Sequence, residues 1–256
     1  MKNLRIIDKI KNTLYPVVTF LIILIIWQLV VEGFNIPQYI LPSPMDIIGV
    51  FFTDYENLYL HTVVTLNEAL LGFILSIIIA LVMGILMDFI PIFKKCFYPI
   101  MLVTQTIPTI TIAPLLIIWF GFGILPKILM VTLTCFFPIL INFVDGMENL
   151  DKDYLNLFKT MNASKLNTFI HLKFPMSMDK LFSGLKISST YAVMAATVAE
   201  WLGGSQGLGV YMVRSKSAYA LDKVFASTLI VVASSLIFVG IIQGIKKIVL
   251  RHKRFC

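Results

Sequence analysis

The sequence predicts an all-α protein that crosses a membrane several times. Of its 256 residues, 58% are hydrophobic and only 14% are charged, whereas soluble domains carry about 25% charged residues. The mean hydropathy is +0.89. The apolar runs are continuous rather than alternating, which favours helices over the strands of a membrane barrel.

Six stretches are long and apolar enough to span a bilayer, which needs about 20 residues. No small-residue cleavage site follows Trp27, so the first stretch is predicted to be a span rather than a signal peptide. The predicted spans are residues 15–31, 62–87, 97–118, 126–144, 182–200 and 224–245. Because no linker or low-complexity tract interrupts the chain, we predict one membrane domain, 1–256, with a polar loop at 145–180 and a basic tail at 246–256.

The basic residues predict the orientation of these spans. Seventeen of the 21 Lys and Arg residues fall in segments on the same side as the N-terminus. Because cytoplasmic loops carry the excess of Lys and Arg, both termini are predicted to be cytoplasmic. Membrane topology therefore accounts for the formal charge of +7, and no nucleic-acid partner is expected.

Residues that would support catalysis or metal binding are scarce. Cys96, Cys135 and Cys256 are far apart and match no metal spacing, so we expect free thiols and no metal site. No G-x-x-x-x-G-K-[ST] phosphate loop and no H-E-x-x-H motif occurs. The sequence therefore predicts neither an enzyme nor a resident cofactor, and any ATP would be bound by a separate subunit.

The polar loop contains two apolar stripes at helical spacing. The first is Leu150, Tyr154, Leu157, Phe158 and Met161; the second is Leu166, Phe169 and Ile170. Between them Asn162 suits a left-handed turn or a helix cap, and Pro175 is predicted to end the second helix. The periodicity alone fits helices that lie on the bilayer equally well as helices that dock into a partner protein.

The same loop resembles that of permease subunits of bacterial binding-protein-dependent ABC importers. That family has Glu-Ala-Ala, a glycine six positions after the Glu, and an Ile-x-Leu-Pro ending. Here Asn156, Leu157 and Phe158 take the first three positions, Asn162 the glycine position, and "LKFP" ends the loop at Pro175. Asn156 cannot form the charge pair expected of the acid. The residues that the resemblance implies for ATPase coupling are Tyr154, Asn156, Leu157, Phe158, Met161, Asn162, Ala163, Leu166, Leu172 and Pro175.

Three further motifs resemble the branch of this family that transports nitrate, sulfonates, taurine and the pyrimidine precursor of thiamine. They are "LPSP" at 41–44, "QTIPTITIAPLLIIWFGFG" at 105–123 and "AEWLGGSQGLGVYM" at 199–212. The resemblance implies a type I importer permease fold with six transmembrane helices and cytoplasmic coupling helices, in a bacterial plasma membrane. It also implies two permease copies as a homodimer, two ABC ATPase subunits and an extracytoplasmic solute-binding protein.

Several polar residues are candidates for the solute pathway or for partner contacts. Pro108 and Pro114 are expected to bend or break the third span, and broken helices are tolerated where they line a cavity. The pathway candidates are Thr104, Gln105, Thr109, Ser189, Thr190 and Met194; local satisfaction of freed carbonyls explains the threonines equally well. The outer-loop candidates for docking the binding protein are Glu200, Trp201, Gly203 and Gly204.

Two further features lie inside the predicted spans: one charged residue and several small residues at helical spacing. Glu68 lies inside the second apolar run, where a charge implies a partner, a cavity or snorkelling to the interface. Small residues at four-residue spacing, including Gly84 and the pair Gly240 and Gly244, are predicted to allow close helix packing.

The predicted function is ATP-driven import of a small solute. The resemblance implies the thiamine pyrimidine precursor, because "AEWLGG...GLGVYM" is more similar to that subgroup, and the absence of arginine from the spans favours a neutral solute over an anion. A permease for sulfonate, taurine or nitrate is the alternative. A self-sufficient secondary carrier would need paired ionisable groups within the membrane, and Glu68 is nearly alone.

Overall fold

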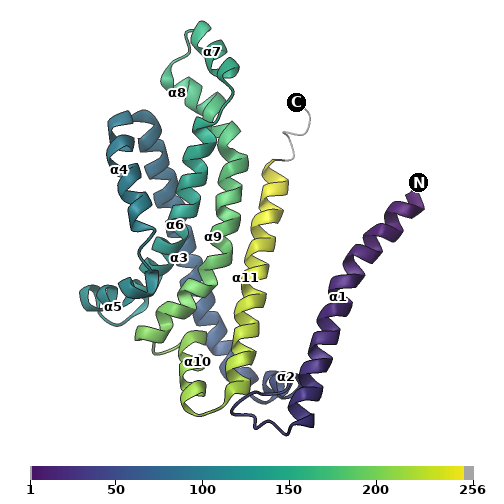
Figure 1. Ribbon diagram of the computed structural model, residues 1–256. Helices are drawn as coiled ribbons and strands as arrows, with labels where there is room; N and C mark the ends of the chain where they lie inside the picture. The colour runs from purple at the N-terminus through teal and green to yellow at the C-terminus, as the bar shows by residue number, and fades with distance from the viewer. Residues whose placement is uncertain (1, 251–256) are drawn as a thin grey trace. The chain divides into compact units, whose positions relative to one another are not determined.

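The computed structural model describes residues 2–250, with side chains from residue 14 onward, and every regular element in this part of the chain is helical. Figure 1 shows the helices in chain order. They are α1 (Lys2–Gly33), α2 (Pro44–Thr53), α3 (Tyr55–Phe89), α4 (Pro91–Thr104), α5 (Thr109–Phe120), α6 (Ile124–Glu148), α7 (Lys152–Thr160), α8 (Lys165–Thr168), the π-helix η1 (Phe169–Lys173), α9 (Phe174–Gly203), α10 (Leu208–Ser217) and α11 (Leu221–Val249). The predicted all-α class is confirmed.

Four of these helices are long and apolar enough to cross a membrane, within the described range. They are Leu14–Gly33 of α1, α3, α6 and α11, and they cover four of the predicted spans. The predicted span 182–200 lies in α9, which has 30 residues but is not among these four. Residues 251–256 of the predicted basic tail lie outside the described part of the chain.

The break predicted for the third span, 97–118, is confirmed. The chain forms α4 and α5 there, bent by 104° at residues 105–108. Pro108 has no N–H to continue the helical ladder, and the residue before a proline is driven away from helical geometry. Pro114, in contrast, lies inside α5 without ending it. The bent pair counts as at most one further span, broken or re-entrant.

The described residues divide into two compact units. Within the described residues, the first contains 2–59 and 211–229, and the second contains 60–210 and 230–250. In the second unit α6 packs closely along α9 (Figure 1). Its core contains Phe143, Ile139 and Val193, all fully buried, together with Leu140 at 1% exposure.

Close packing of α6 on α9 depends on a glycine. A Cβ on Gly184 of α9 would lie 2.5 Å from the carbonyl oxygen of Pro138. The Pro138 carbonyl is part of the backbone of α6 and cannot rotate out of contact as a side chain could. We therefore expect Gly184→Ala to destabilise the protein by about 1–3 kcal/mol. The measurement is the midpoint of SDS-induced unfolding in mixed micelles.

Gly240 provides the matched control, since nothing lies within 4 Å of its Cβ position. Gly240→Ala is expected to leave the midpoint unchanged or to raise it by up to ~1 kcal/mol through helix propensity. An equal loss in both variants would contradict the packing role of Gly184. The predicted packing of Gly240 and Gly244 is wrong for the described chain because both positions face open space, whereas a Cβ on Gly84 would meet Phe143.

In the first unit, one carboxylate links three elements. Asp54, between α2 and α3, accepts hydrogen bonds from the Tyr211 hydroxyl at 2.8 Å and from Lys223 Nζ at 2.6 Å. Asn57 also donates to it. Burial alone would raise the pKa of Asp54, but these donors outweigh it and lower the pKa to about 2. The cluster therefore joins the α2–α3 corner to α10 and α11.

This cluster predicts a specific loss of stability in acid. Because the pKa of Asp54 is lower in the folded protein than in the unfolded chain, its contribution is complete above pH 4 and is lost as the pH falls towards 2. We expect Asp54→Asn to destabilise the protein at pH 7 by about 1 kcal/mol, reduced by screening of the partly exposed Lys223. Unfolding midpoints measured from pH 6 to pH 2 should converge for the two proteins at the acid end. A constant difference across that range would contradict this role.

Candidate functional site

The chain between α6 and α9 forms an elbow that presents apolar side chains to the outside. Its first arm is α7, where the Asp151 side chain caps the helix by accepting the Asp153 N–H at 3.1 Å. Leu157 is 53% exposed and Met161 is 70% exposed. Figure 1 shows α7 and α8 projecting beyond the ends of α6 and α9.

The turn of the elbow has the geometry that Asn162 favours. Asn162 has φ 51°, in the left-handed region, which confirms the left-handed turn predicted for it. The cap of the second arm is Ser164, whose hydroxyl oxygen accepts the Asn167 N–H. We call the exposed apolar side chains of the two arms the elbow set: Tyr154, Leu157, Met161, Leu166 and Ile170.

The prediction that Pro175 ends the second helix is wrong. The chain stays helical from α8 through the π-helix η1 into α9, with Pro175 in the first turn of α9. Inside a continuous helix a proline removes one backbone hydrogen bond, and the π-helix η1, which ends two residues before Pro175, is where the pattern of these bonds changes. At η1 the Phe174 N–H donates instead to the Phe169 carbonyl, five residues back. The second arm is therefore continuous with α9.

The remaining loop candidates differ in exposure. Asn156 is exposed, on the side of α7 away from the elbow set. Phe158 and Ala163 are half-buried, and Leu172 is buried. Phe169, which belongs to the second predicted stripe, contacts Phe89 and Phe174 with ring centroids 5.3 and 5.9 Å apart. The buried side chains of Leu172 and Phe169 thus anchor the elbow to the second unit.

The candidate pathway residues lie on two parts of the chain. Thr104 and Gln105 are exposed at the break between α4 and α5, and Thr109 is half-buried at the start of α5. On α9, Thr190 and Met194 are exposed, whereas Ser189 is buried. The hydroxyls of Thr104, Ser189 and Thr190 each donate to a carbonyl three residues back. None of the described hydrogen bonds joins one candidate to another.

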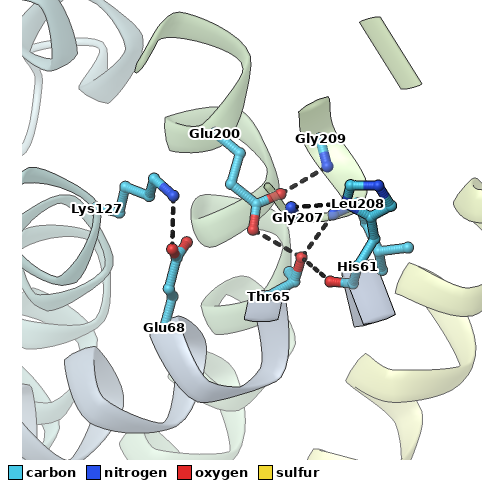
Figure 2. Close-up of polar contacts among 8 residues, drawn as sticks. All are labelled: His61, Thr65, Glu68, Lys127, Glu200, Gly207, Leu208 and Gly209. Atoms are coloured by element: carbon cyan, nitrogen blue, oxygen red, sulfur yellow. Dashed lines mark hydrogen bonds and ion pairs between the residues drawn. The ribbon is translucent and has the colours of Figure 1, made fainter. Parts of the chain in front are cut away.

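Glu200 occupies a position that the sequence did not indicate. Its side chain is 1% exposed and points into the protein rather than towards an outer partner (Figure 2). One carboxylate oxygen accepts the Thr65 hydroxyl at 2.7 Å, and the other accepts the Gly209 N–H at 2.6 Å. Thr65 also accepts the Leu208 N–H at 2.8 Å. The carboxylate therefore joins α3, α9 and the start of α10.

Glycine makes this closure possible. Gly207 has φ 118°, and a Cβ there would lie 2.1 Å from the Glu200 carboxylate. The Gly207 N–H donates to His61 Nδ1 at 2.9 Å, as Figure 2 shows. The end of the "GGSQGLG" stretch is thus a fixed connection, not a loose loop.

A buried ion pair lies beside this cluster. Lys127 Nζ is 2.6 Å from Glu68 Oε1, and their side chains are 9% and 2% exposed (Figure 2). The sequence indicated that Glu68 needs a partner, but Lys127 lies 59 residues away in the chain. Glu68 Oε2 is buried and accepts from no N–H or hydroxyl donor in the described chain, and the Glu68 carboxyl group interacts with that of Glu200.

The remaining outer-loop candidates border a cleft. Trp201, Gly203 and Gly204 line it together with Glu68 and Lys127, and its volume is about 660 Å³. Trp201 is 46% exposed. The cleft therefore combines an aromatic surface with the buried ion pair.

Comparison with known proteins decides the family. Residues 72–254 match the family model described as "Binding-protein-dependent transport system inner membrane component". The chain belongs to this family of ABC importer permeases. The match covers the elbow, Glu200 and most of the residues that line the cleft, and it begins after His61, Thr65 and Glu68.

Similar proteins support the assignment over most of the chain. A "Probable ABC transporter permease protein" of Haemophilus influenzae is 37% identical over 87% of this chain and 91% of that protein. The "Formylaminopyrimidine transport permease protein ThiX" of Halalkalibacterium halodurans is 33% identical over 95% and 97%. The "Putative aliphatic sulfonates transport permease protein SsuC" of Bacillus subtilis is 28% identical over 86% and 79%.

Membership has direct consequences for this permease. It is a multi-pass protein of the inner membrane, consistent with its four to five apolar helices. Proteins of this family are transport subunits rather than enzymes, and they work with an ABC ATPase and a solute-binding protein.

Proposed function

We propose that this permease is driven by a separate ATPase subunit that docks on the elbow set. Exposure of Tyr154, Leu157, Met161, Leu166 and Ile170 carries this proposal. Apolar side chains that gather on a projecting loop are typical of a protein interface. Polar and charged residues such as Asn156 and Lys159 occupy the opposite side of α7, as expected of a helix that docks by one face.

Continuity of the second arm with α9 supports a mechanism for coupling. When the ATPase pair closes around ATP, displacement of the elbow would pass through α8 and η1 directly into α9. No hinge of irregular chain intervenes between these elements. The expected result is a rigid-body tilt of α9 that alternates access to the solute pathway.

The assembly and orientation follow from the same proposal. Two permease copies form a homodimer with two ATPase subunits, and both termini and the elbow are cytoplasmic, as the distribution of Lys and Arg favours. ATP is bound by the partner subunit, with no cofactor in the permease. Trp201, Gly203 and Gly204 remain candidates for contact with the binding protein, whereas the Glu200 carboxylate contributes by holding the adjacent loop.

The proposed solute is the thiamine pyrimidine precursor. Its support is the printed function of the 33% identical ThiX protein. A sulfonate or nitrate is the alternative, because SsuC of Bacillus subtilis and NrtB of Leptolyngbya laminosa are 28% and 27% identical. Thr104, Gln105, Thr109, Ser189, Thr190 and Met194 remain the proposed pathway residues.

Reconstitution tests this function directly. The permease is co-expressed with its cognate ATPase and binding protein, and ATP hydrolysis in liposomes is measured with formylaminopyrimidine, taurine and nitrate. We expect formylaminopyrimidine to stimulate ATP hydrolysis. Without the ATPase subunit we expect no hydrolysis. Facilitated uptake by the permease alone would contradict the proposal.

A further inference from the structure

We propose that Glu200 keeps a proton in the folded permease and donates it in a hydrogen bond to Glu68. The two side chains then form an acid–carboxylate pair, with Lys127 as the counter-ion of Glu68. One bound proton thereby holds the connection between α9 and α10 closed. The assignment concerns the permease alone and depends neither on the solute nor on the ATPase.

The first reason is the charge of a buried cluster. Among the described residues, Glu68 and Glu200 are the only buried acidic side chains, at 2% and 1% exposure. Lys127, at 7% exposure, is the only buried basic side chain in the same part of the chain. If both carboxyl groups were ionised, two negative charges would face one positive charge away from water, and an uncompensated buried charge is costly. A single proton makes the cluster neutral.

The second reason is a buried acceptor that lacks a donor. Lys127 Nζ is 2.6 Å from Glu68 Oε1, whereas no N–H or hydroxyl group of the described chain donates to Glu68 Oε2. The carboxyl group of Glu200 interacts with that of Glu68. An ionised carboxylate can only accept hydrogen bonds, but a protonated carboxyl group has one O–H to donate. A proton on Glu200 therefore supplies the missing donor.

The geometry of α3 brings the two carboxyl groups together. Thr65 and Glu68 are three residues apart and therefore lie on the same face of the helix. The Thr65 hydroxyl donates to one oxygen of Glu200 at 2.7 Å, so the Glu200 carboxyl group lies over that face (Figure 2). The other oxygen accepts the Gly209 N–H at 2.6 Å. Because a protonated oxygen can still accept a hydrogen bond, protonation keeps both contacts.

The shared proton links the end of α9 to the pH of the solution. Without it, Glu200 would place a second negative charge beside Glu68 with no further counter-ion, and two adjacent carboxylates repel each other. That repulsion acts on the side chain that accepts from α3 and from the Gly209 N–H of α10. Loss of the proton is therefore expected to loosen the connection between α9 and α10.

Infrared spectroscopy detects this proton directly, because the C=O stretch of a protonated carboxyl group is separate from the bands of a carboxylate. The permease is purified in dodecyl maltoside, a detergent without carbonyl groups, and measured at pH 7. We expect one protonated-carboxyl band that is lost in Glu200→Gln. The matched control is Glu148→Gln, which changes an exposed carboxyl group and should leave the band in place.

Glu68→Gln tests whether charge balance holds the proton. This variant leaves Lys127 without its counter-ion, so Glu200 is expected to ionise and to take over that role. The protonated-carboxyl band should then disappear although Glu200 is still present. Persistence of the band in folded Glu68→Gln would contradict the balance of one ammonium group, one carboxylate and one acid.

The pH dependence of unfolding gives a second readout. An unfolded chain releases the Glu200 proton above about pH 4.3, whereas the folded protein keeps it, so the free energy of unfolding falls as the pH rises. With one linked proton, the unfolding equilibrium constant should rise about tenfold per pH unit between pH 5 and pH 7, relative to Glu200→Gln. His61, whose Nδ1 accepts the Gly207 N–H, is present in both proteins, so its titration cancels in this comparison.

Three results would overturn the assignment: no protonated-carboxyl band in the unmodified permease at pH 7, a band that Glu200→Gln leaves in place, or equal pH dependence of unfolding in the two proteins. If Glu200→Gln does not fold, the first result still decides, because it needs only the unmodified permease. None of these measurements uses the ATPase or transport, so their failure leaves the proposed function untouched.

Discussion

Leu157→Asp is expected to weaken binding of the ATPase subunit by about 100-fold, equivalent to ~3 kcal/mol, and to abolish coupled transport. Leu157 is 53% exposed on α7, so its replacement removes little packing within the permease. At a docked interface the same change loses apolar burial and desolvates a charge without a partner. Binding is measured by co-purification and by titration of the ATPase into nanodiscs that contain the permease.

The matched control is Lys159→Asp, which introduces the same side chain on the opposite side of α7. We expect near-normal binding, since only an exposed position changes. Unfolding midpoints of both variants should equal that of the unmodified protein. Equal weakening by the two substitutions would show that α7 responds to charge in general and does not dock by its apolar face.

Glu200→Ala is expected to cost about 3–5 kcal/mol of stability, because it removes the acceptor of two buried donors and opens a cavity. The affected groups are the Thr65 hydroxyl and the Gly209 N–H, which now donate to the carboxylate at 2.7 and 2.6 Å. The measurement is again the midpoint of SDS-induced unfolding, with proteolysis after Gly207 as a local probe of the released loop.

Two variants calibrate this loss. Glu200→Gln keeps the shape but can accept at only one of its two terminal atoms, so we expect an intermediate cost of about 1–3 kcal/mol. Glu148→Ala removes a carboxylate from an exposed pair with Lys94 and should cost roughly 0.5 kcal/mol or less. If Glu200→Ala were as mild as Glu148→Ala, the cluster would not hold α3, α9 and α10 together.

The sequence predicted the features that depend on a single short segment of the chain. Continuous apolar runs predicted α1, α3, α6 and α11, because the length and hydropathy of a span are properties of one segment. The positive φ of Asn162 followed from its tolerance of the left-handed region. The capping box of Ser43 and Asp46, which starts α2 at the end of "LPSP", also has a local signature in the sequence, S-P-M-D.

Proline required context that the sequence did not provide. Pro108 is the N-cap of α5, after the break that follows α4, Pro114 lies inside α5, and Pro175 lies in the first turn of α9. Each lacks the same N–H, yet the helix is interrupted only before Pro108. The missing N–H alone therefore does not predict where a helix ends.

Contacts between residues far apart in the sequence explain why Glu200 was expected at the surface and why Lys127 was not predicted as the partner of Glu68. A charge in an apolar run indicated that Glu68 has a partner, but nothing near it pointed to Lys127. Glu200 was expected at the surface because "GGSQGLG" follows it. The structure instead folds that stretch back, so that the Gly209 N–H reaches the carboxylate. Neither contact has a signature within one helix.

Hydrogen–deuterium exchange of the permease in nanodiscs, with and without its cognate ATPase, tests the central claim most directly. The account predicts that amides of α7 and of the turn at Asn162 exchange rapidly in the permease alone and are protected when the ATPase is added. Protection of α7 already present in the permease alone, and unchanged by the ATPase, would show that lipid or the permease itself covers the elbow set, and would contradict the account.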